Sequence, residues 1–236
     1  MSNGIASAFL LAVLVVAIGG CDFGAASQQR PNAVRNGLES PPPSARYGVD
    51  PARHRVWILT RDGVSIYDVT RSERIVVPLP YWLWVDAPYA YLPDLALGPR
   101  GEAVITSNVV PTLWRIDPET LAVVSVHPLL LDSDTDKDVG FSGLVYSSEH
   151  EAFFAVSDLH GSLWRIDPDL GRARKIWLST PVRKAFGLTV LPRLLRQQTS
   201  RQTELCVRTP RGGRAVDFAP GERSAYVSAA PCAGRA

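Results

Sequence analysis

The sequence predicts an all-β fold built from a repeated unit of four short strands. The hexapeptide Leu-Trp-Arg-Ile-Asp-Pro occurs at 113–118 and again at 163–168, an offset of 50 residues. In both places an apolar run and a turn precede it and a further apolar run follows it, which indicates strands of about 4–7 residues. A repeat of about 40–50 residues with four strands per unit is typical of a β-propeller.

Composition is compatible with this fold and excludes few functions. The chain has 236 residues, of which 46% are hydrophobic and 20% charged, so a packed core is expected. The 19 prolines and 18 glycines suit many short strands and turns. A formal net charge of +2 gives no reason to expect a nucleic-acid partner.

The N-terminus predicts export. Ala8–Ile18 is an uncharged apolar run that is shorter than the roughly 20 residues of a membrane span and has the length of a signal-peptide core. The following Ile18-Gly19-Gly20-Cys21 resembles the lipobox of bacterial lipoproteins. The resemblance implies that residues 1–20 are removed and that Cys21 is lipidated at the periplasmic side of a membrane.

Two alternatives to the lipoprotein interpretation stay open. The first four residues, Met-Ser-Asn-Gly, lack the Lys or Arg of a typical signal peptide. An ordinary secretory signal or a short anchor helix, with Cys21 incidental, would account for the same apolar run. Residues 21–46 are polar, contain proline and have no periodicity, so they are expected to form a flexible tether after the lipidated cysteine.

The propeller domain is expected over residues 47–236. Its blades are placed at about 47–92, 93–138 and 139–182, with an irregular remainder at 183–236. Asp68, Asp117 and Asp167 fall in register, 49 and then 50 residues apart. Asp117 and Asp167 are each followed by Pro, and this pair favours a type I turn. Within each Leu-Trp-Arg-Ile strand, Trp and Ile share one face, so the Trp is expected to pack one blade against the next.

These units resemble the loosely defined bacterial propeller repeats of the YVTN, NHL and gluconolactonase-like groups. The resemblance covers about residues 45–230. It implies the architecture and leaves the activity open, because such folds include binding proteins and enzymes alike.

The pattern breaks after about residue 178. Residues 183–214 carry eight Lys or Arg and a single acidic residue, Glu204, which indicates either a basic insertion facing an anionic partner or a solvated loop. Residues 215–230 are interpreted as a fourth copy that ends after its second strand. The propeller is therefore expected to be incomplete, with about four to five blade units. A four-bladed ring with an irregular last blade is the alternative.

Functional residues are expected on one face of the propeller. The strand two-to-three loops and the links between blades lie on that face and are longer than the tight turns opposite. The first link carries Trp82, Trp84, Tyr89 and Tyr91, which could contact a ligand or could pack as a lid on the blade below.

The second link carries alternating carboxylates, Asp132, Asp134, Asp136 and Asp138. Oxygen ligands at this spacing suit Ca²⁺, and the segment resembles the start of a calcium-binding loop. It departs from that pattern at Lys137, where glycine is required, and at Gly143, where the twelfth position requires Glu. A solvated acidic loop is the alternative to a calcium site.

Asn108, Asp158 and His160 occupy matching positions of successive blades and are further candidate ligand contacts. They are loose equivalents of the Glu, Asn and Asp that hold a metal in gluconolactonase-type hydrolases. Cys206 and Cys232 could pair as a disulfide in an exported chain or could both be free.

The sequence thus predicts a membrane-tethered, exported propeller that binds a protein, peptide or glycan partner and no nucleic acid. A metal-dependent propeller enzyme of the lactonase type is one alternative. A truncated, non-functional fragment of a longer propeller is the other. No catalytic residue is assigned, and Ca²⁺ is the only cofactor considered.

Overall fold

A computed structural model of the chain describes residues 45–83, 91–131, 140–192, 203–219 and 223–232. The described residues form 17 β-strands and contain no helix. Accordingly, no helix within these ranges is long and apolar enough to cross a membrane. All of them belong to one compact unit, residues 37–236.

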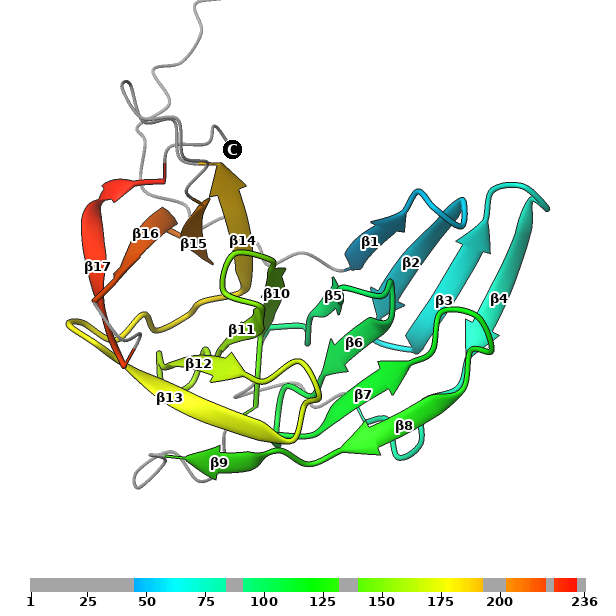
Figure 1. The fold of residues 1–236 in the computed structure, drawn as a ribbon, viewed down its shortest axis with the longest axis horizontal. Helices are drawn as coiled ribbons and strands as arrows, with labels where there is room; N and C mark the ends of the chain where they lie inside the picture. The colour runs from blue at the N-terminus through cyan, green and yellow to red at the C-terminus, as the bar shows by residue number, and fades with distance from the viewer. Residues whose placement is uncertain (1–44, 84–90, 132–139, 193–202, 220–222, 233–236) are drawn as a thin grey trace, which may run out of the picture. The chain divides into compact units, whose positions relative to one another are not determined.

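The strands form four antiparallel blades in chain order, which confirms the expected β-propeller architecture (Figure 1). The first blade comprises β1 (Arg46–Asp50), β2 (Arg55–Thr60), β3 (Gly63–Asp68) and β4 (Glu73–Val77). The second comprises β5 (Leu95–Leu97), β6 (Ala103–Thr106), β7 (Leu113–Ile116) and β8 (Val123–Val126).

The third blade comprises β10 (Gly143–Ser147), β11 (Ala152–Val156), β12 (Leu163–Ile166) and β13 (Arg172–Leu178). The fourth comprises β14 (Gly187–Pro192), β15 (Thr203–Thr209), β16 (Gly212–Phe218) and β17 (Ser224–Pro231). The additional strand β9 (Leu129–Leu131) pairs in parallel with the outer strand β13. In every blade the first strand is innermost (Figure 1).

The repeated Trp and Ile pack each blade against the preceding one, as the strand period predicts. Trp114 and Ile116 of β7 lie in a buried cluster with the first blade, whereas Leu113 of the same strand faces the third blade. Trp164 and Ile166 repeat this arrangement one blade later. Three such apolar clusters separate the four blades, so the core lies between the blades. The third and fourth blades are also joined at their outer edge, where β13 and β17 pair in parallel.

The repeated aspartates close the turns between the third and fourth strands. The carboxylate of Asp117 accepts hydrogen bonds from the N–H groups of Glu119 and Thr120 at 2.9 and 2.8 Å. Asp68 accepts the N–H of Arg71 at 3.0 Å in the same way. These bonds are the physical reason for the aspartate in the first two repeats.

The C-terminal segment differs from the expectation. The described residues between 187 and 231 form a four-stranded blade, so the interpretation of 183–236 as irregular is wrong for the described residues. Residues 215–230 contain β16 and β17, the third and fourth strands of that blade, rather than its first two. Asp217 lies 50 residues after Asp167, in the same third-strand register.

Arg46 is also placed differently from the expectation. It was assigned to the tether, but it is the first residue of β1 and pairs with Leu59 of β2. The inner strand of the first blade therefore begins with a cation.

Candidate functional site

A cavity of about 750 Å³ lies where the inner strands of the four blades converge, and we call it the axial cavity. It is lined by β1, β5, β10 and β14 and by one residue of β15. The polar and aromatic residues of its lining are Arg46, Tyr47, Asp94, Tyr146, Phe186, Thr189 and Arg208. Because each inner strand belongs to a different blade, a molecule in this cavity would contact all four repeats.

The guanidinium of Arg46 reaches from the first blade to the inner ends of the other three. Its Nε lies 3.4 Å from the carboxylate of Asp94. It also donates hydrogen bonds to main-chain carbonyls that precede the inner strands of later blades, namely those of Leu92, Pro93, Ser142 and Phe186. These acceptors leave the guanidinium largely occupied by the protein itself.

Asp94 joins the second blade to its neighbours on both sides. Its Oδ1 accepts the N–H of Leu95 and its Oδ2 accepts the N–H of Leu144 in β10, both at 2.9 Å. Burial raises the pKa of Asp94, and the attraction of Arg46 and these two hydrogen bonds offset only part of that effect. With both oxygens engaged, Asp94 serves to fix the blades rather than to accept a proton from a substrate.

Hydroxyl groups make similar links further round the axis. Ser142, which precedes β10, donates from Oγ to the carbonyl of Ala185 at 2.5 Å. Thr106 of β6 donates from Oγ1 to the carbonyl of Phe141 at 2.8 Å. The inner ends of the blades are therefore held together by buried polar contacts, which give the axial cavity a defined wall.

Trp82 and Tyr91 of the first link pack against the blades. The ring of Trp82 lies 5.4 Å from that of Trp114, edge to face, and its Nε1 donates to the carbonyl of Arg61 at 3.0 Å. Tyr91 is 9% exposed and lies 5.9 Å from Phe186. Trp82 and Tyr91 thus pack as the lid alternative describes, and a ligand contact by either ring stays a prediction. Trp84 and Tyr89 lie outside the described residues.

Asn108 and Asp158 occupy equivalent loops, between β6 and β7 and between β11 and β12. Asn108 is 1% exposed, and Asp158 is half-buried. Burial raises the pKa of Asp158 to about 6, although its own N–H, that of Leu159 and the nearby His160 act in the opposite direction. None of the three candidates Asn108, Asp158 and His160 lines the axial cavity.

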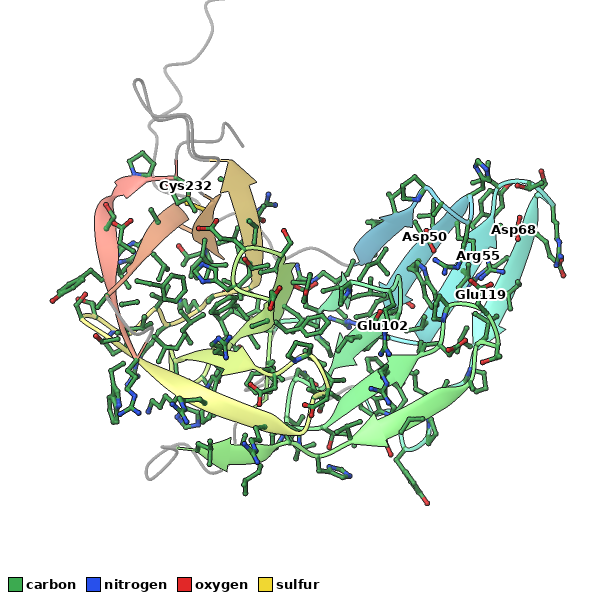
Figure 2. All side chains as sticks on the ribbon, viewed as in Figure 1. Asp50, Arg55, Asp68, Glu102, Glu119 and Cys232 are labelled. Carbon is green, nitrogen blue, oxygen red and sulfur yellow. A yellow bond between two sulfur atoms is a disulfide. The ribbon has the colours of Figure 1, made fainter. Side chains whose placement is uncertain are left out.

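The candidate metal ligands Asp132, Asp134, Asp136 and Asp138 lie outside the described residues, as does Cys21. Within the described ranges, no group of three His, Cys, Asp or Glu side chains is arranged to hold a metal ion. Cys206 and Cys232 form a disulfide that ties β15 to the residue after β17 (Figure 2).

Two smaller cavities lie on the loop-bearing face. One, of about 330 Å³, lies beside Trp114 and is bordered by Tyr81, whose side chain is 97% exposed on a backbone with φ of 58°. The other, of about 400 Å³, lies between the link to the fourth blade and the β15–β16 turn. Its lining residues are Pro181, Val182, Arg183, Lys184, Thr209, Pro210, Arg211 and Arg214.

The opposite face carries ion pairs that hold the turns of the first two blades together (Figure 2). Arg53 lies 3.1 Å from Asp50 and 2.7 Å from Glu119 of the second blade. Arg55 lies 3.8 Å from Asp68 within the first blade. These charges pair with one another, which favours a structural role over ligand binding.

Sequence reasoning missed the part that Arg46 plays in the axial cavity, whereas the cations of the smaller basic cavity all lie in the basic segment 183–214 that the sequence singled out. Arg46 contacts residues that lie 46 to 140 positions away in the sequence. Short-range sequence patterns do not predict contacts between residues so far apart. Arg214, by contrast, lies 50 residues after Trp164 and could have been found by continuing the repeat offset.

The chain matches no protein-family model and none of the curated proteins. Its fold is similar to that of solved propeller-type structures. Virginiamycin B lyase from Staphylococcus aureus aligns with a TM-score of 0.54 and 13% identity, over 80% of this chain and 55% of the lyase chain. A streptogramin B lyase structure aligns with a TM-score of 0.53 and 11% identity, over 80% and 54%.

Hydrazine synthase from Kuenenia stuttgartiensis aligns with a TM-score of 0.51 and 11% identity, over 87% of this chain and 53% of that one. The chain therefore spans about half the length of these three structures. At such identities the likeness concerns the fold alone.

Proposed function

We propose that this chain is a ligand-binding propeller module, held at the periplasmic side of a bacterial membrane by an acyl group on Cys21. The observation that carries the binding role is the axial cavity, which is lined by the inner strands of all four blades. A volume of about 750 Å³ is within the usual range of small-ligand and peptide-segment sites.

The chemistry of the lining suits a segment of a peptide or glycan partner. Tyr47 is 67% exposed on β1 and provides a ring face for an apolar or sugar surface. Thr189 and Arg208, on neighbouring strands of the fourth blade, provide hydrogen-bond donors on the other side of the cavity. Arg46 and Asp94 stiffen the wall and so reduce the cost of ordering the site on binding.

The alternative of a metal-dependent enzyme has no supporting observation among the described residues. Its candidate groups Asn108, Asp158 and His160 do not line the axial cavity. We therefore propose binding without turnover as the primary activity.

The binding role is tested by probing peptide and glycan arrays with the purified full chain and then measuring affinity for the best probe by calorimetry. We expect Tyr47→Ala to weaken binding at least tenfold. Tyr226→Ala is the matched control, since Tyr226 is 65% exposed but lies on the outer strand β17. Equal binding by the two variants, or no array signal for the wild-type chain, would refute the proposal.

The anchoring role is tested separately, by metabolic labelling with an alkynyl fatty acid in a bacterial host. We expect label and membrane association for the wild-type chain and loss of both for Cys21→Ala. Membrane association of an unlabelled wild-type chain would instead support the anchor-helix alternative, and a soluble periplasmic chain would support an ordinary secretory signal.

A further inference from the structure

The cavity of about 400 Å³ beside the fourth blade has its origin in a break of the repeat. In β7 and β12 the residue opposite Ile105 and Ala155 of the preceding strand is a tryptophan, Trp114 or Trp164. In β16 the equivalent residue, opposite Val207, is Arg214. The three residues are spaced by 50 in the sequence.

Each tryptophan of the repeat fills the space above the link that enters its blade. Trp114 donates from Nε1 to the carbonyl of Pro80 at 2.9 Å, and Pro80 is the third residue after β4. Trp164 lies edge to face with Phe141 of the next link at 6.2 Å. The indole rings thus seal the first two junctions between link and blade.

At the fourth blade this space is not filled by an indole ring. Pro181 is the third residue after β13 and so corresponds to Pro80, and it lines the cavity together with Val182, Pro210 and Arg214. The cavity therefore has an apolar floor of proline and valine where the repeat would place an aromatic ring.

The rim of this cavity is strongly basic. Arg183 and Lys184 come from the link, and Arg211 and Arg214 come from the β15–β16 turn and from β16. The lining includes no carboxylate, and among the described residues Arg183, Arg211 and Arg214 form no ion pair. Arginines that converge without a counter-charge favour an anion, and their planar groups also stack on aromatic rings.

We propose that this cavity is a binding site for an aromatic carboxylate. The ring of the ligand takes the place of the missing indole on Pro181 and Val182, and the carboxylate pairs with Arg211 and Arg214. Either a free small molecule or the C-terminal aromatic residue of a peptide offers this chemistry. The site is separate from the axial cavity, so it stands whether or not the proposed function is correct.

The proposal is tested by calorimetry on the full chain with indole-3-acetate as the probe. A peptide that ends in Trp with a free carboxylate, and the same peptide with an amidated end, distinguish the two sources. We expect binding of indole-3-acetate, at least tenfold weaker binding of the amide than of the free peptide, and weaker binding at higher salt. Preference for the free acid peptide over indole-3-acetate would assign the site to a peptide terminus.

Variants make the test specific. Arg214→Trp restores the side chain of the repeat, so it should fill the cavity, abolish binding and leave the melting temperature equal or higher. Arg211→Gln should weaken binding about tenfold without filling the space. Arg172→Gln, an exposed position on β13, is the control and should bind as the wild type does.

The Tyr47→Ala variant of the axial cavity should bind indole-3-acetate normally, which separates the two sites. The absence of any heat from the wild-type chain with indole-3-acetate and the acid peptide would overturn the proposal. So would unchanged binding by both Arg214→Trp and Arg211→Gln.

Discussion

Asp94 shows how a single residue can hold several blades together at the scale of one side chain. Its carboxylate is buried, lies 3.4 Å from Arg46 and accepts two main-chain N–H groups. Burial alone disfavours the charged form, as the raised pKa of Asp94 indicates. A buried pair of this kind adds little net stability over an apolar pair, but the removal of one member leaves the other charge unpaired.

We therefore expect Asp94→Asn to lower the free energy of unfolding by about 3–5 kcal/mol, because Arg46 then remains buried without its counter-charge. Urea unfolding followed by fluorescence measures the change. Asp62→Asn, at an exposed turn, is the matched control and should change stability by less than about 0.5 kcal/mol. If Asp94→Asn lowered the free energy of unfolding as little as the control does, the Arg46–Asp94 pair would not be what holds the blades together.

The raised pKa of Asp158 predicts that the stability of the folded protein depends on pH. Its folded-state pKa of about 6 lies above the value of 3.8 expected for an unfolded chain, so the folded protein binds the proton more tightly. Stability should therefore fall as pH rises from about 4 to about 6 and stay reduced above that range. Asp158→Asn should stabilise the protein at pH 7.5 by about 1–2 kcal/mol, after allowance for the partial exposure of the side chain, and have little effect at pH 4.

Thermal melting at both pH values measures this difference. Asp169→Asn, an exposed turn position in the same blade, controls for the loss of a surface charge. If Asp158→Asn raised the stability by the same amount at pH 4 and at pH 7.5, the pH dependence could not be assigned to this carboxylate.

At the scale of the element, the fourth blade is the one that a disulfide reinforces. Cys206 of β15 is joined to Cys232, 26 residues further on, so the bond ties the second strand to the end of the fourth. Gly213 of β16 makes room for it, since a Cβ there would lie 2.8 Å from the sulfur of Cys206 and 3.0 Å from that of Cys232. This blade also lacks the tryptophan that seals the earlier junctions.

Replacement of both cysteines by serine should lower the free energy of unfolding by about 3.5 kcal/mol, the loop-closure value for a ring of this length. Gly213→Ala should destabilise the disulfide-bonded chain and be better tolerated in the double serine variant, because the crowded sulfur atoms are then absent. A four-variant cycle of urea unfolding curves measures this coupling. Equal effects of Gly213→Ala in both backgrounds would show that the glycine does not accommodate the disulfide.

The blades also show which elements a sequence can predict. The second and third blades share the letters Leu-Trp-Arg-Ile-Asp-Pro, and the first keeps the same order of apolar runs, so local periodicity was sufficient for all three. In the fourth, only Asp217 and its apolar neighbour Val216 remain of that motif, and the segment was assigned to the wrong strands. Arg214 in place of tryptophan removed the residue by which the third strand is recognised.

The site was less predictable than the fold for a physical reason. The axial cavity is formed by inner strands that lie 40 to 50 residues apart in sequence and meet only in the folded chain. Aromatic residues in a link suggest a ligand platform, yet Trp82 and Tyr91 pack against Trp114 and Phe186. Whether an aromatic ring of the link packs on the protein or contacts a ligand depends on which residues lie beneath the ring. The sequence of the link alone does not predict those residues.

At the scale of the whole described unit, one face of the first blade differs in its exposure from the equivalent face of the second blade. Tyr47, Ile58 and Ser65 of the first blade form the row that corresponds, by strand register, to Leu95, Ile105 and Trp114 of the second. The row of the second blade is buried beneath the first. On the first blade, Ser65 is buried, but Tyr47 is 67% exposed and its neighbours on the same face, Val49 and Val76, are 65% and 68% exposed. This face keeps the apolar character of an inter-blade surface.

An exposed apolar sheet face favours association between molecules. We therefore expect light scattering of the purified chain to rise with concentration more steeply than for Val76→Lys, which places a charge on this face without touching the axial cavity. Val124→Lys is the control, since Val124 is 49% exposed on the outer strand β8 and should leave the association unchanged. Static scattering across a hundredfold concentration range measures the difference. If the wild-type chain scatters as an ideal solute throughout, or if both lysine variants behave alike, the face of the first blade is not the surface through which the molecules associate.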